Sequence, residues 1–552
     1  MSFSLLKNLK SKSIAYRQSL YAWIDYRKYA SSLHSFYKIA EKLPEQKNGS
    51  LLIVSGRGMN VLLAQLWPVF SLAVRVHGYR GLVLTTHTQQ HLNRYFWLLG
   101  IEPIFLDDLI KVAPADLPVE LSHQIQEATT FEAIKNLSYK ETPIGQIALS
   151  TYSRYQGTGV IDLNNPTVLK FVREWIEQIY KAMQVAEMVY KQYNVQYLFF
   201  AEVFMEEYGA FYYTALLNDL NIIRFAGTVR DNAFILQHMT KSNDRCHHAS
   251  LSPTSWKKVK AMPLTPKIEA ELEQNFLDRY GDKWHRSKRN HPNTRIMPVE
   301  EARRILNIAE GRKIAVIYSH ILYDTLFFFG TDLFNDYADW LVETVRVACQ
   351  NPAVDWLVKV HPSNLWRGEL GTLLKGKYEE ERLLQNEFGE LPQHVRIVSA
   401  DTKINPYTWF QLSDYGITVR GTAGLEMAAL GKTVITAGTG RYEGNGFTVD
   451  PRDKDEYLDI LKKLPDIPPL SQEQVRLAKR YAYAIFVLKP FTLKCMKPTF
   501  RTGVREVRAS DDIVQLGVQF DTNGHTLPPD LQKVSKWVLE KDNHDLLPEW
   551  IA

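Results

Sequence analysis

Two separate runs of alternating strand and helix patterns constrain the fold of this 552-residue chain more than any other feature. The first run begins with the apolar segment 51–54 and continues with strand-like segments at 82–85 and 103–105, each preceded by a longer helical stretch. A second run starts afresh at residues 314–318. Such alternation is typical of doubly wound parallel sheets, and a chain of this length is too long for one core. We therefore expect an α/β protein in which two Rossmann-type domains face each other across a cleft.

The remaining segments extend both runs in the same way. The first run continues with a helix at 168–193, a strand at 197–200, a helix at 208–220 and a closing strand at 222–224. The second run continues with a helix at 333–349 and with strands at 356–360, 395–398, 415–418 and 433–436. A late helix from about 472 to 488 should stop at Pro490, because proline lacks the N–H group and its ring opposes a further helical turn.

The segment between the two runs, residues 281–298, is polar, basic and rich in turn-forming residues. That composition is typical of a solvated interdomain linker. The predicted division of the chain is a helical extension at 1–48, a first Rossmann-like domain at 49–290, a second at 291–480, and a crossover helix with a tail at 481–552.

Composition and charge exclude several classes of protein. The longest apolar run, 61–74, is too short to cross a bilayer, and the N-terminus has no signal-peptide pattern, so we expect a cytoplasmic protein. The basic, aromatic-rich first 45 residues could instead lie peripherally on the inner face of the membrane or pack on their own domain. Three widely spaced cysteines fit neither a disulfide framework nor a cysteine-based zinc site. A net charge of +5 is mild for this length and does not indicate a nucleic-acid partner.

The strongest local signal is the turn Gly421-Thr422-Ala423-Gly424, which lies between a predicted strand and a predicted helix. Backbone N–H groups at such a helix start, together with the hydroxyl of Thr422, can bind phosphate oxygens. Ligands of open α/β sheets bind at the carboxyl ends of strands, which is where this turn falls. Glu426, in the first helical turn, could accept hydrogen bonds from ribose hydroxyls. The alternative is an ordinary strand-to-helix turn in which Glu426 only complements the helix dipole.

A second strand end carries His361-Pro362 after the predicted strand 356–360. A histidine at this edge can donate to a phosphate oxygen, whereas we expect Lys359 to point elsewhere because side chains alternate along a strand. A lone histidine after a strand is more often structural. Its pairing with the turn at 421–424 within one Rossmann unit favours a common phosphate site.

These motifs together resemble the bacterial capsule and surface polysaccharide glycosyltransferases, a broad family that includes the capsular Kdo transferases. The resemblance rests on His361-Pro362, on the 421–424 turn with Glu426, and on the glycine-containing run 437–448. The segment 319–324 is also similar, and the match covers roughly residues 310–490. It implies a GT-B fold with an acceptor-binding first domain and a donor-binding second domain. It also implies that a nucleotide sugar, often a CMP-sugar such as CMP-Kdo, is held by the residues here numbered His361, Thr422 and Glu426.

One departure from the family pattern leaves the nucleotide open. CMP-using relatives have adjacent Ser or Thr residues in the turn, whereas this chain has Thr422-Ala423. We add Pro362, Arg420, Arg441 and Tyr442 to the predicted donor site. The guanidinium of Arg441, in a glycine-rich and therefore flexible loop, could bind phosphate or carboxylate as a bidentate fork. The alternative is a long surface hairpin.

Transfer to an acceptor hydroxyl needs a general base within hydrogen-bond reach. Glu202, directly after the predicted strand 197–200, is the first candidate, and Asp324 and His87 are rivals. In the first domain, Arg57 and His87 are candidates for acceptor binding, although Arg57 could simply cap a helix.

The sequence predicts neither a metal nor a cofactor other than the nucleotide-sugar substrate. No Asp-x-Asp pair ends a strand, so backbone dipoles, His361 and Arg441 would meet the phosphate charge. The predicted function is metal-independent transfer of a sugar to a surface or capsular polysaccharide or its lipid-linked precursor. The alternatives are a polyol-phosphate transferase of the teichoic-acid type, a catalytically silent glycan-binding or scaffold protein, and a nucleotide epimerase.

Overall fold

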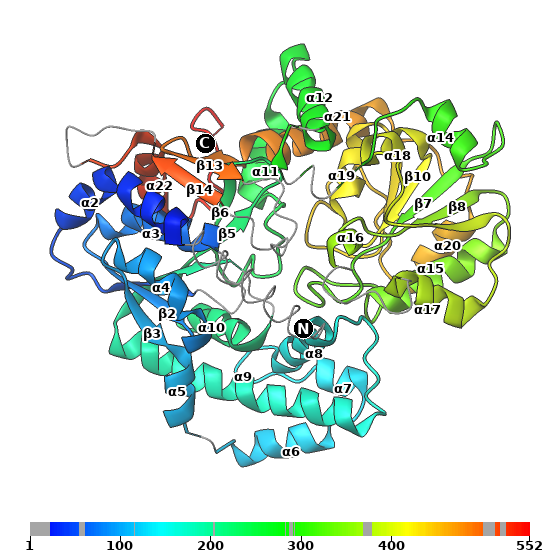
Figure 1. The fold of residues 1–552 in the computed structure, drawn as a ribbon. Helices are drawn as coiled ribbons and strands as arrows, with labels where there is room; N and C mark the ends of the chain where they lie inside the picture. The colour runs from blue at the N-terminus through cyan, green and yellow to red at the C-terminus, as the bar shows by residue number, and fades with distance from the viewer. Residues whose placement is uncertain are drawn as a thin grey trace, which may run out of the picture.

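A mainly parallel sheet and an all-parallel sheet, each wrapped by helices, form the two lobes of the molecule (Figure 1). This computed structural model describes residues 23–54, 61–114, 116–201, 205–281, 283–285, 287, 291, 293–367, 378–500, 514–518 and 526–551. Over these residues the larger sheet has seven strands and the smaller has five.

The larger sheet has the strand order β12-β6-β5-β4-β1-β2-β3. Its strands are β1 Ser50–Val54, β2 Arg80–Thr85, β3 Glu102–Phe105, β4 Val195–Phe200, β5 Asn221–Gly227, β6 Ala233–Met239 and β12 Phe491–Thr492. The five strands β1 to β5 run parallel, whereas β6 and β12 are antiparallel to their neighbours. The strand order 3-2-1-4-5-6 is that of a Rossmann sheet, and the order reverses between the parallel strands β1 and β4.

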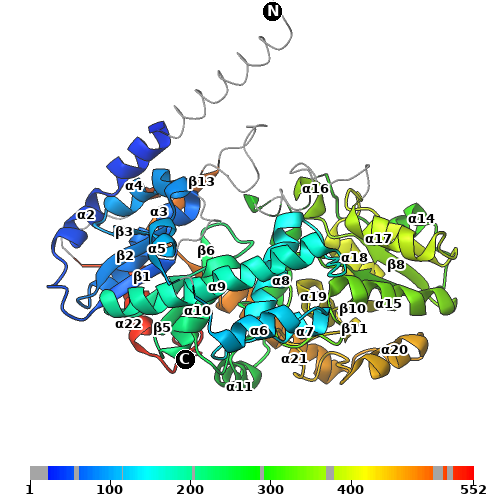
Figure 2. The ribbon, with the colours of Figure 1, turned by 90° about the horizontal axis from the view of Figure 1, so that it is seen from below.

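Helices cover both faces of this sheet. One face packs on α2 His34–Glu41, α3 Val61–Arg75 and α4 Gln90–Trp97. A helical stretch at 23–32 precedes α2. The other face carries the longest helix, α9 Pro166–Gln192, with α8 Ile144–Gln156 and α10 Glu206–Leu217. The shorter helices are α5 Leu106–Val112, α6 Val119–Glu127 and α7 Phe131–Lys135. Seen from below, α7 and α8 lie where the first lobe meets the second (Figure 2).

The smaller sheet repeats the plan with the order β11-β10-β7-β8-β9, all parallel. Its strands are β7 Ile314–Tyr318, β8 Asp355–Lys359, β9 Val395–Val398, β10 Tyr415–Thr418 and β11 Thr433–Thr436. Around it lie α14 Val299–Ile305, α15 Tyr337–Gln350, α16 Asn364–Arg367, α17 Glu379–Phe388, α18 Pro406–Leu412, α19 Thr422–Ala429 and α20 Lys454–Lys462. The order reverses between β7 and β10, so the switch point of this sheet lies where the turn at 421–424 begins.

The C-terminal segment crosses back from the second lobe to the first. Helix α21 Gln472–Tyr483 continues into a π-helical turn at Ala484–Leu488, after which β12 joins the larger sheet. The hairpin β13 Met496–Phe500 and β14 Val514–Val518 and the helix α22 Pro529–Leu539 follow, and α22 packs on α3. This return ties the two lobes together at the top of Figure 1.

The fold confirms the α/β, GT-B-like class predicted from the sequence, with several differences. The strand at 222–224 does not close the first sheet, because β6 and β12 extend it with antiparallel pairing. Helices α11 Pro253–Ala261 and α12 Pro266–Tyr280 precede the expected boundary at 290/291 yet pack against α21, and α12 also packs against α18. The boundaries themselves stay a prediction. In the part of the chain that the structure describes, no helix is both long and apolar enough to span a membrane.

Candidate functional site

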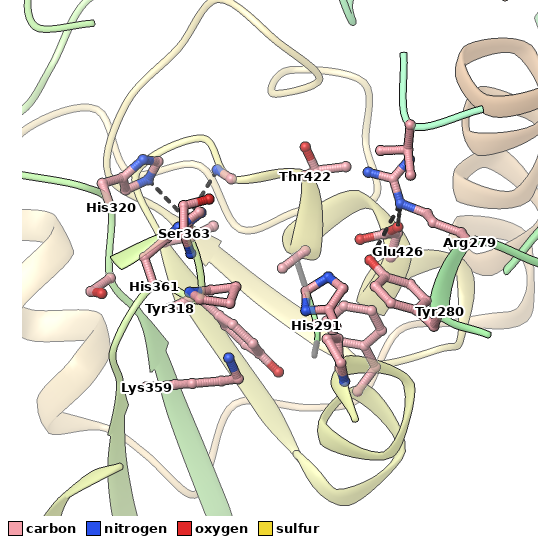
Figure 3. Close-up of a pocket in the computed structure, with 18 of the residues that line it drawn as sticks. Arg279, Tyr280, His291, Tyr318, His320, Lys359, His361, Ser363, Thr422 and Glu426 are labelled. Carbon is pink, nitrogen blue, oxygen red and sulfur yellow. Dashed lines mark hydrogen bonds and ion pairs between the residues drawn. The ribbon is translucent and has the colours of Figure 1, made fainter. Parts of the chain in front are cut away.

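A cavity of about 270 Å³ lies at the carboxyl edge of the smaller sheet, where β7, β8 and β10 end (Figure 3). Residues that follow these three strands form one side of it. Helix α18, the end of α12, Ser287 and His291 form the other. The cavity therefore sits at the topological switch point, the place where open α/β sheets bind ligands.

The turn after β10 brings the start of α19 to the cavity. Gly421 is the N-cap residue and no side chain caps the helix, so the N–H groups of its first turn are directed towards the cavity, which Thr422 and Ala423 help to line. Gly424 is required by packing, because a Cβ there would lie 2.1 Å from the hydroxyl of Tyr442. That hydroxyl donates to the carbonyl of Gly421 at 2.7 Å. Tyr442 thus supports the turn from behind.

His361 and Pro362 lie beside this helix start, as the sequence predicts. The Nδ1 atom of His361 accepts a hydrogen bond from the backbone N–H of Ser363 at 3.2 Å. In a neutral imidazole this places the proton on Nε2. His361 is therefore set up as a donor, the role that a phosphate oxygen requires.

A second histidine, His320, follows β7 and lines the same cavity. Its ring stacks on Tyr337 at 4.5 Å, and its Nε2 lies 3.2 Å from the hydroxyl of Thr418. Burial, together with the charge of Arg420, holds the pKa of His320 well below its usual range, so the ring is neutral. The sequence analysis noted His320 only within the segment 319–324. The shared signal is that both histidines come directly after a strand of one sheet.

Arg441 reaches the cavity from the glycine loop after β11. Its Nη1 donates to the carbonyl of Arg420 at 2.9 Å, and its own carbonyl accepts from the hydroxyl of Tyr481 at 2.6 Å. Its backbone N–H donates to Glu443. Burial lowers the pKa of Arg441 to about 10, which leaves it charged at neutral pH. The loop that we expected to be flexible is thus held at several points against the body of the lobe.

Arg420 lies behind the turn rather than in the cavity lining. Its side chain is 3% exposed, forms an ion pair with Asp332, and donates to the hydroxyl of Tyr337 at 3.1 Å and to the carbonyl of Thr439 at 2.8 Å. The geometry gives Arg420 and Tyr442 the task of holding the turn and the glycine loop in place.

Glu426 is more deeply embedded than the sequence suggested. It is 1% exposed and forms an ion pair with Arg279 at 2.8 Å, and Tyr280 also hydrogen-bonds to it. Burial raises the pKa of the Glu426 carboxyl, and Arg279 partly offsets that rise. Both partners come from α12, which therefore forms part of the cavity wall (Figure 3). A hydrogen bond from a ribose hydroxyl to Glu426 would have to share the carboxylate with Arg279.

Two residues correct the sequence analysis. We expected Lys359 to point elsewhere, but it lines the cavity, because residues two apart on a strand face the same side and His361 follows at that spacing. We also expected the segment 281–298 to be solvated, but Ser287 and His291 line the cavity and Trp284 is 8% exposed. Burial, with the charge of Lys359, lowers the pKa of His291 to about 3.

The charge of the cavity is positive. Three of its described lining residues are cationic, namely Arg279, Lys359 and Arg441, whereas Glu426 is the single carboxylate among them. A helix start adds partial positive charge at the same place. The arrangement therefore favours an anionic ligand, such as one that carries phosphate.

The predicted catalytic and acceptor residues that the structure describes do not line the cavity. Glu202 and Arg57 fall outside the described residues. Asp324 forms an ion pair with Arg154 of α8, where the two lobes meet. His87 stacks on Phe105 in the larger sheet and contacts Asp108 at 2.9 Å. Neither Asp324 nor His87 is among the described residues that line the cavity. Within the described ranges, no group of three or more His, Cys, Asp or Glu side chains is arranged to hold a metal ion.

Comparisons with known proteins give structural neighbours only. No family model and no curated protein matches the chain. A β-Kdo 2,4 transferase, KpsC from Thermosulfurimonas dismutans, is 15% identical over 53% of this chain and 80% of that one, with a TM-score of 0.32. A UDP-GlcNAc 2-epimerase from Neisseria meningitidis is 11% identical over 79% and 98% of the two chains, with a TM-score of 0.26. A glycosyltransferase from Rickettsia africae is 11% identical over 80% and 94%, with a TM-score of 0.27. Sugar transferases and an epimerase are thus among the solved structures to which the chain is similar, all at low identity.

Proposed function

We propose that this protein is a glycosyltransferase that moves a sugar from a nucleotide-sugar donor to an acceptor glycan. The observation that carries the proposal is the convergence of three phosphate-binding features on one cavity. These are the uncapped start of α19 at Thr422, the donor Nε2 of His361, and the buried guanidinium of Arg441. They come from three different strand ends of one sheet, and the sheet places them at its switch point.

The same groups suit the chemistry of transfer. Negative charge grows on the leaving phosphate as the bond to the sugar breaks, and preorganised donors in a water-poor site stabilise that charge. His361 and the N–H groups of α19 are such donors, and Arg441 is held in place by its contacts with the turn. The acceptor enters from the first lobe in this proposal, and its general base comes from that lobe.

The acceptor we propose is a surface or capsular polysaccharide or its lipid-linked precursor. This follows from the motif resemblance at His361-Pro362 and at the turn 421–424. The proposal leaves the nucleotide of the donor open, because Ala423 stands where CMP-using relatives carry a second hydroxyl.

Thermal-shift measurements with CMP-, UDP-, GDP- and dTDP-sugars test the donor directly. We expect one of them to raise the unfolding temperature, because a ligand at 100 times its dissociation constant stabilises the folded state by about 2.7 kcal/mol. Transfer of sugar to a glycan acceptor, rather than binding alone, then separates the enzyme from a silent glycan-binding protein. Absence of a shift with all four donors would contradict the proposal, and epimerised sugar released without an acceptor would redirect it.

Metal independence is a separate proposal with its own test. In this proposal backbone N–H groups, an imidazole and a guanidinium stabilise the negative charge of the phosphate, which a metal ion does in metal-dependent transferases. We expect transfer to proceed at an unchanged rate after treatment with EDTA. Loss of activity with EDTA, and its recovery on addition of Mg²⁺ or Mn²⁺, would show that this part of the proposal is wrong.

A further inference from the structure

The end of the cavity opposite the α19 start holds a buried lysine. Figure 3 shows Lys359 at the far end of the cavity from Thr422, on the side of Tyr318 and His291. Lys359 is 6% exposed, and among the residues that the structure describes no hydrogen bond or ion pair reaches its ammonium group. An ammonium group removed from water without a partner is costly. This lysine thus lines the cavity without a hydrogen-bond partner among the described residues.

The surroundings of Lys359 are mainly flat and apolar. The ring centroids of Tyr280 and Phe410 are 5.5 Å apart, and those of Tyr318 and Phe410 are 6.0 Å apart. The ring centroid of His291 lies 5.7 Å from that of Tyr280. Pro362 and Pro406 complete this end of the cavity. Phosphate is bound by several converging donors, as at the other end, whereas this end offers aromatic faces and one ammonium. Aromatic side chains of this kind bind the faces of nucleobases.

We propose that this end of the cavity binds the base of the donor nucleotide, and that the Lys359 ammonium donates a hydrogen bond to an exocyclic carbonyl oxygen of that base. The proposal rests on the nucleotide-sugar function proposed above and adds the class of base to it. The phosphate at the α19 start and the base at Lys359 then span the cavity. The bound carbonyl supplies a partner that the ammonium lacks among the described residues.

The chemistry of lysine predicts which bases fit. Its ammonium can only donate hydrogen bonds. Cytosine, uracil, thymine and guanine each carry an exocyclic carbonyl oxygen, whereas the exocyclic group of adenine is an amino donor and its acceptors are ring nitrogens. Lys359 therefore selects a carbonyl-bearing base against adenine.

The lowered pKa of Lys359 is consistent with this role. Burial lowers it to about 8, so the side chain is still mostly protonated at neutral pH and can donate. The neighbouring rings add no competing charge, since His291 is neutral at that pH.

Isothermal titration of CMP, UMP, GMP, AMP and pyrophosphate into the wild type and the Lys359→Met variant tests the proposal. We expect the wild type to bind AMP at least about ten-fold more weakly than its best carbonyl-bearing nucleotide. The variant should weaken that nucleotide by about ten-fold or more, the usual worth of a hydrogen bond to a charged group. Its affinity for AMP and for pyrophosphate should change by less than about three-fold.

Controls separate binding from folding. Lys313→Met removes an exposed lysine that pairs with Asp414 before β7, at the opposite edge of the same sheet, and should change no affinity. The unfolding temperature of ligand-free Lys359→Met should equal or exceed that of the wild type, because the variant removes a buried charge that none of the described residues pairs. A marked fall would indicate a structural partner for Lys359 and would count against the proposal.

Three other outcomes would overturn it. Equal affinity of the wild type for AMP and for the other nucleotides would rule out the proposed contact between Lys359 and a base carbonyl. Equal weakening of pyrophosphate and of the best nucleotide in Lys359→Met would place phosphate at this lysine. In both cases nucleotide binding, and with it the proposed function, would stand. If no nucleotide or pyrophosphate binds the wild type, the proposed function fails and the base contact fails with it.

Discussion

Replacement of Lys489 by methionine is expected to lower the free energy of unfolding by about 3–5 kcal/mol, the usual cost of breaking a buried ion pair from one side. Lys489 and Asp545 are both 0% exposed, and the Nζ and Oδ1 atoms lie 2.5 Å apart. Lys489 follows the crossover helix, whereas Asp545 belongs to the C-terminal tail. The variant leaves the Asp545 carboxylate in the interior without its counter-charge. Urea denaturation of the two proteins measures the loss.

A second substitution tests whether the loss of stability comes from the Asp545 carboxylate that has lost its counter-charge. Asp545 also accepts the backbone N–H of Ser252 at 2.8 Å, and an asparagine oxygen can keep that bond. The double variant Lys489→Met with Asp545→Asn should therefore be more stable than Lys489→Met alone, and the difference is the coupling between the two sites. Lys494→Met, an exposed lysine five residues away, is the matched control and should be nearly neutral.

The pH dependence of this loss has a definite sign. Burial would raise the pKa of Asp545, but the Lys489 ammonium holds it below its usual range. The wild type thus gains stability from this group above the ordinary aspartate pKa of about 3.9 and loses it as the pH falls through the lower folded value. In Lys489→Met the hydrogen bond from Ser252 remains, but the ammonium that most strongly lowers the pKa of Asp545 is gone, so burial raises that pKa and protonation relieves the variant. The difference in the free energy of unfolding between the wild type and Lys489→Met should decrease from pH 7 to pH 4. A constant difference would contradict the explanation that the loss comes from the buried Asp545 carboxylate.

The core of the second lobe could be predicted almost residue by residue. The expected strands at 314–318, 395–398, 415–418 and 433–436 coincide with β7, β9, β10 and β11. Parallel strands covered on both faces give continuous apolar runs bounded by turns, and such runs are easy to find. The helix expected at 333–349 begins later, at Tyr337, because Asp336 caps it by accepting the N–H of Asp339 at 2.8 Å. That cap is a local signal that the sequence does contain.

Contacts between distant segments could not be predicted. Strand β12 has two residues, and it forms only because the crossover helix delivers it to β6. The wall of the cavity likewise depends on α12 reaching α19, where Arg279 meets Glu426. No local pattern around either residue encodes that meeting. The orientation of Lys359 was wrongly predicted, although the sequence does contain its signal: the two-residue spacing to His361 places both side chains on one face.

The phosphate end of the cavity could be predicted because each of its parts has a local signature. A histidine-proline pair after one strand and a small-residue turn after another both carry that signature. Their common place at the sheet edge follows from the topology of parallel strands. His320 has the same signature in weaker form, without a proline or glycine beside it.

Replacement of His361 by alanine is expected to lower kcat/KM for sugar transfer by about 10²–10³, the usual effect of removing one donor to developing oxyanion charge. The loss should fall mainly on kcat, because the charge on the leaving phosphate is greatest in the transition state. His394→Ala, which removes a histidine bonded to the carbonyl of Ala348 outside the cavity, is the matched control. Steady-state kinetics with the donor found by thermal shift measure both variants.

Two amide variants divide the roles of the His361 ring. An asparagine oxygen can replace Nδ1 and accept the N–H of Ser363, whereas a glutamine amide can reach the position of Nε2 and donate as the imidazole does. We expect His361→Gln to retain more activity than His361→Asn, since donation to phosphate is the catalytic role. The opposite order would mean that His361 acts by holding the backbone at Ser363. The phosphate would then depend on the α19 start and on Arg441 alone.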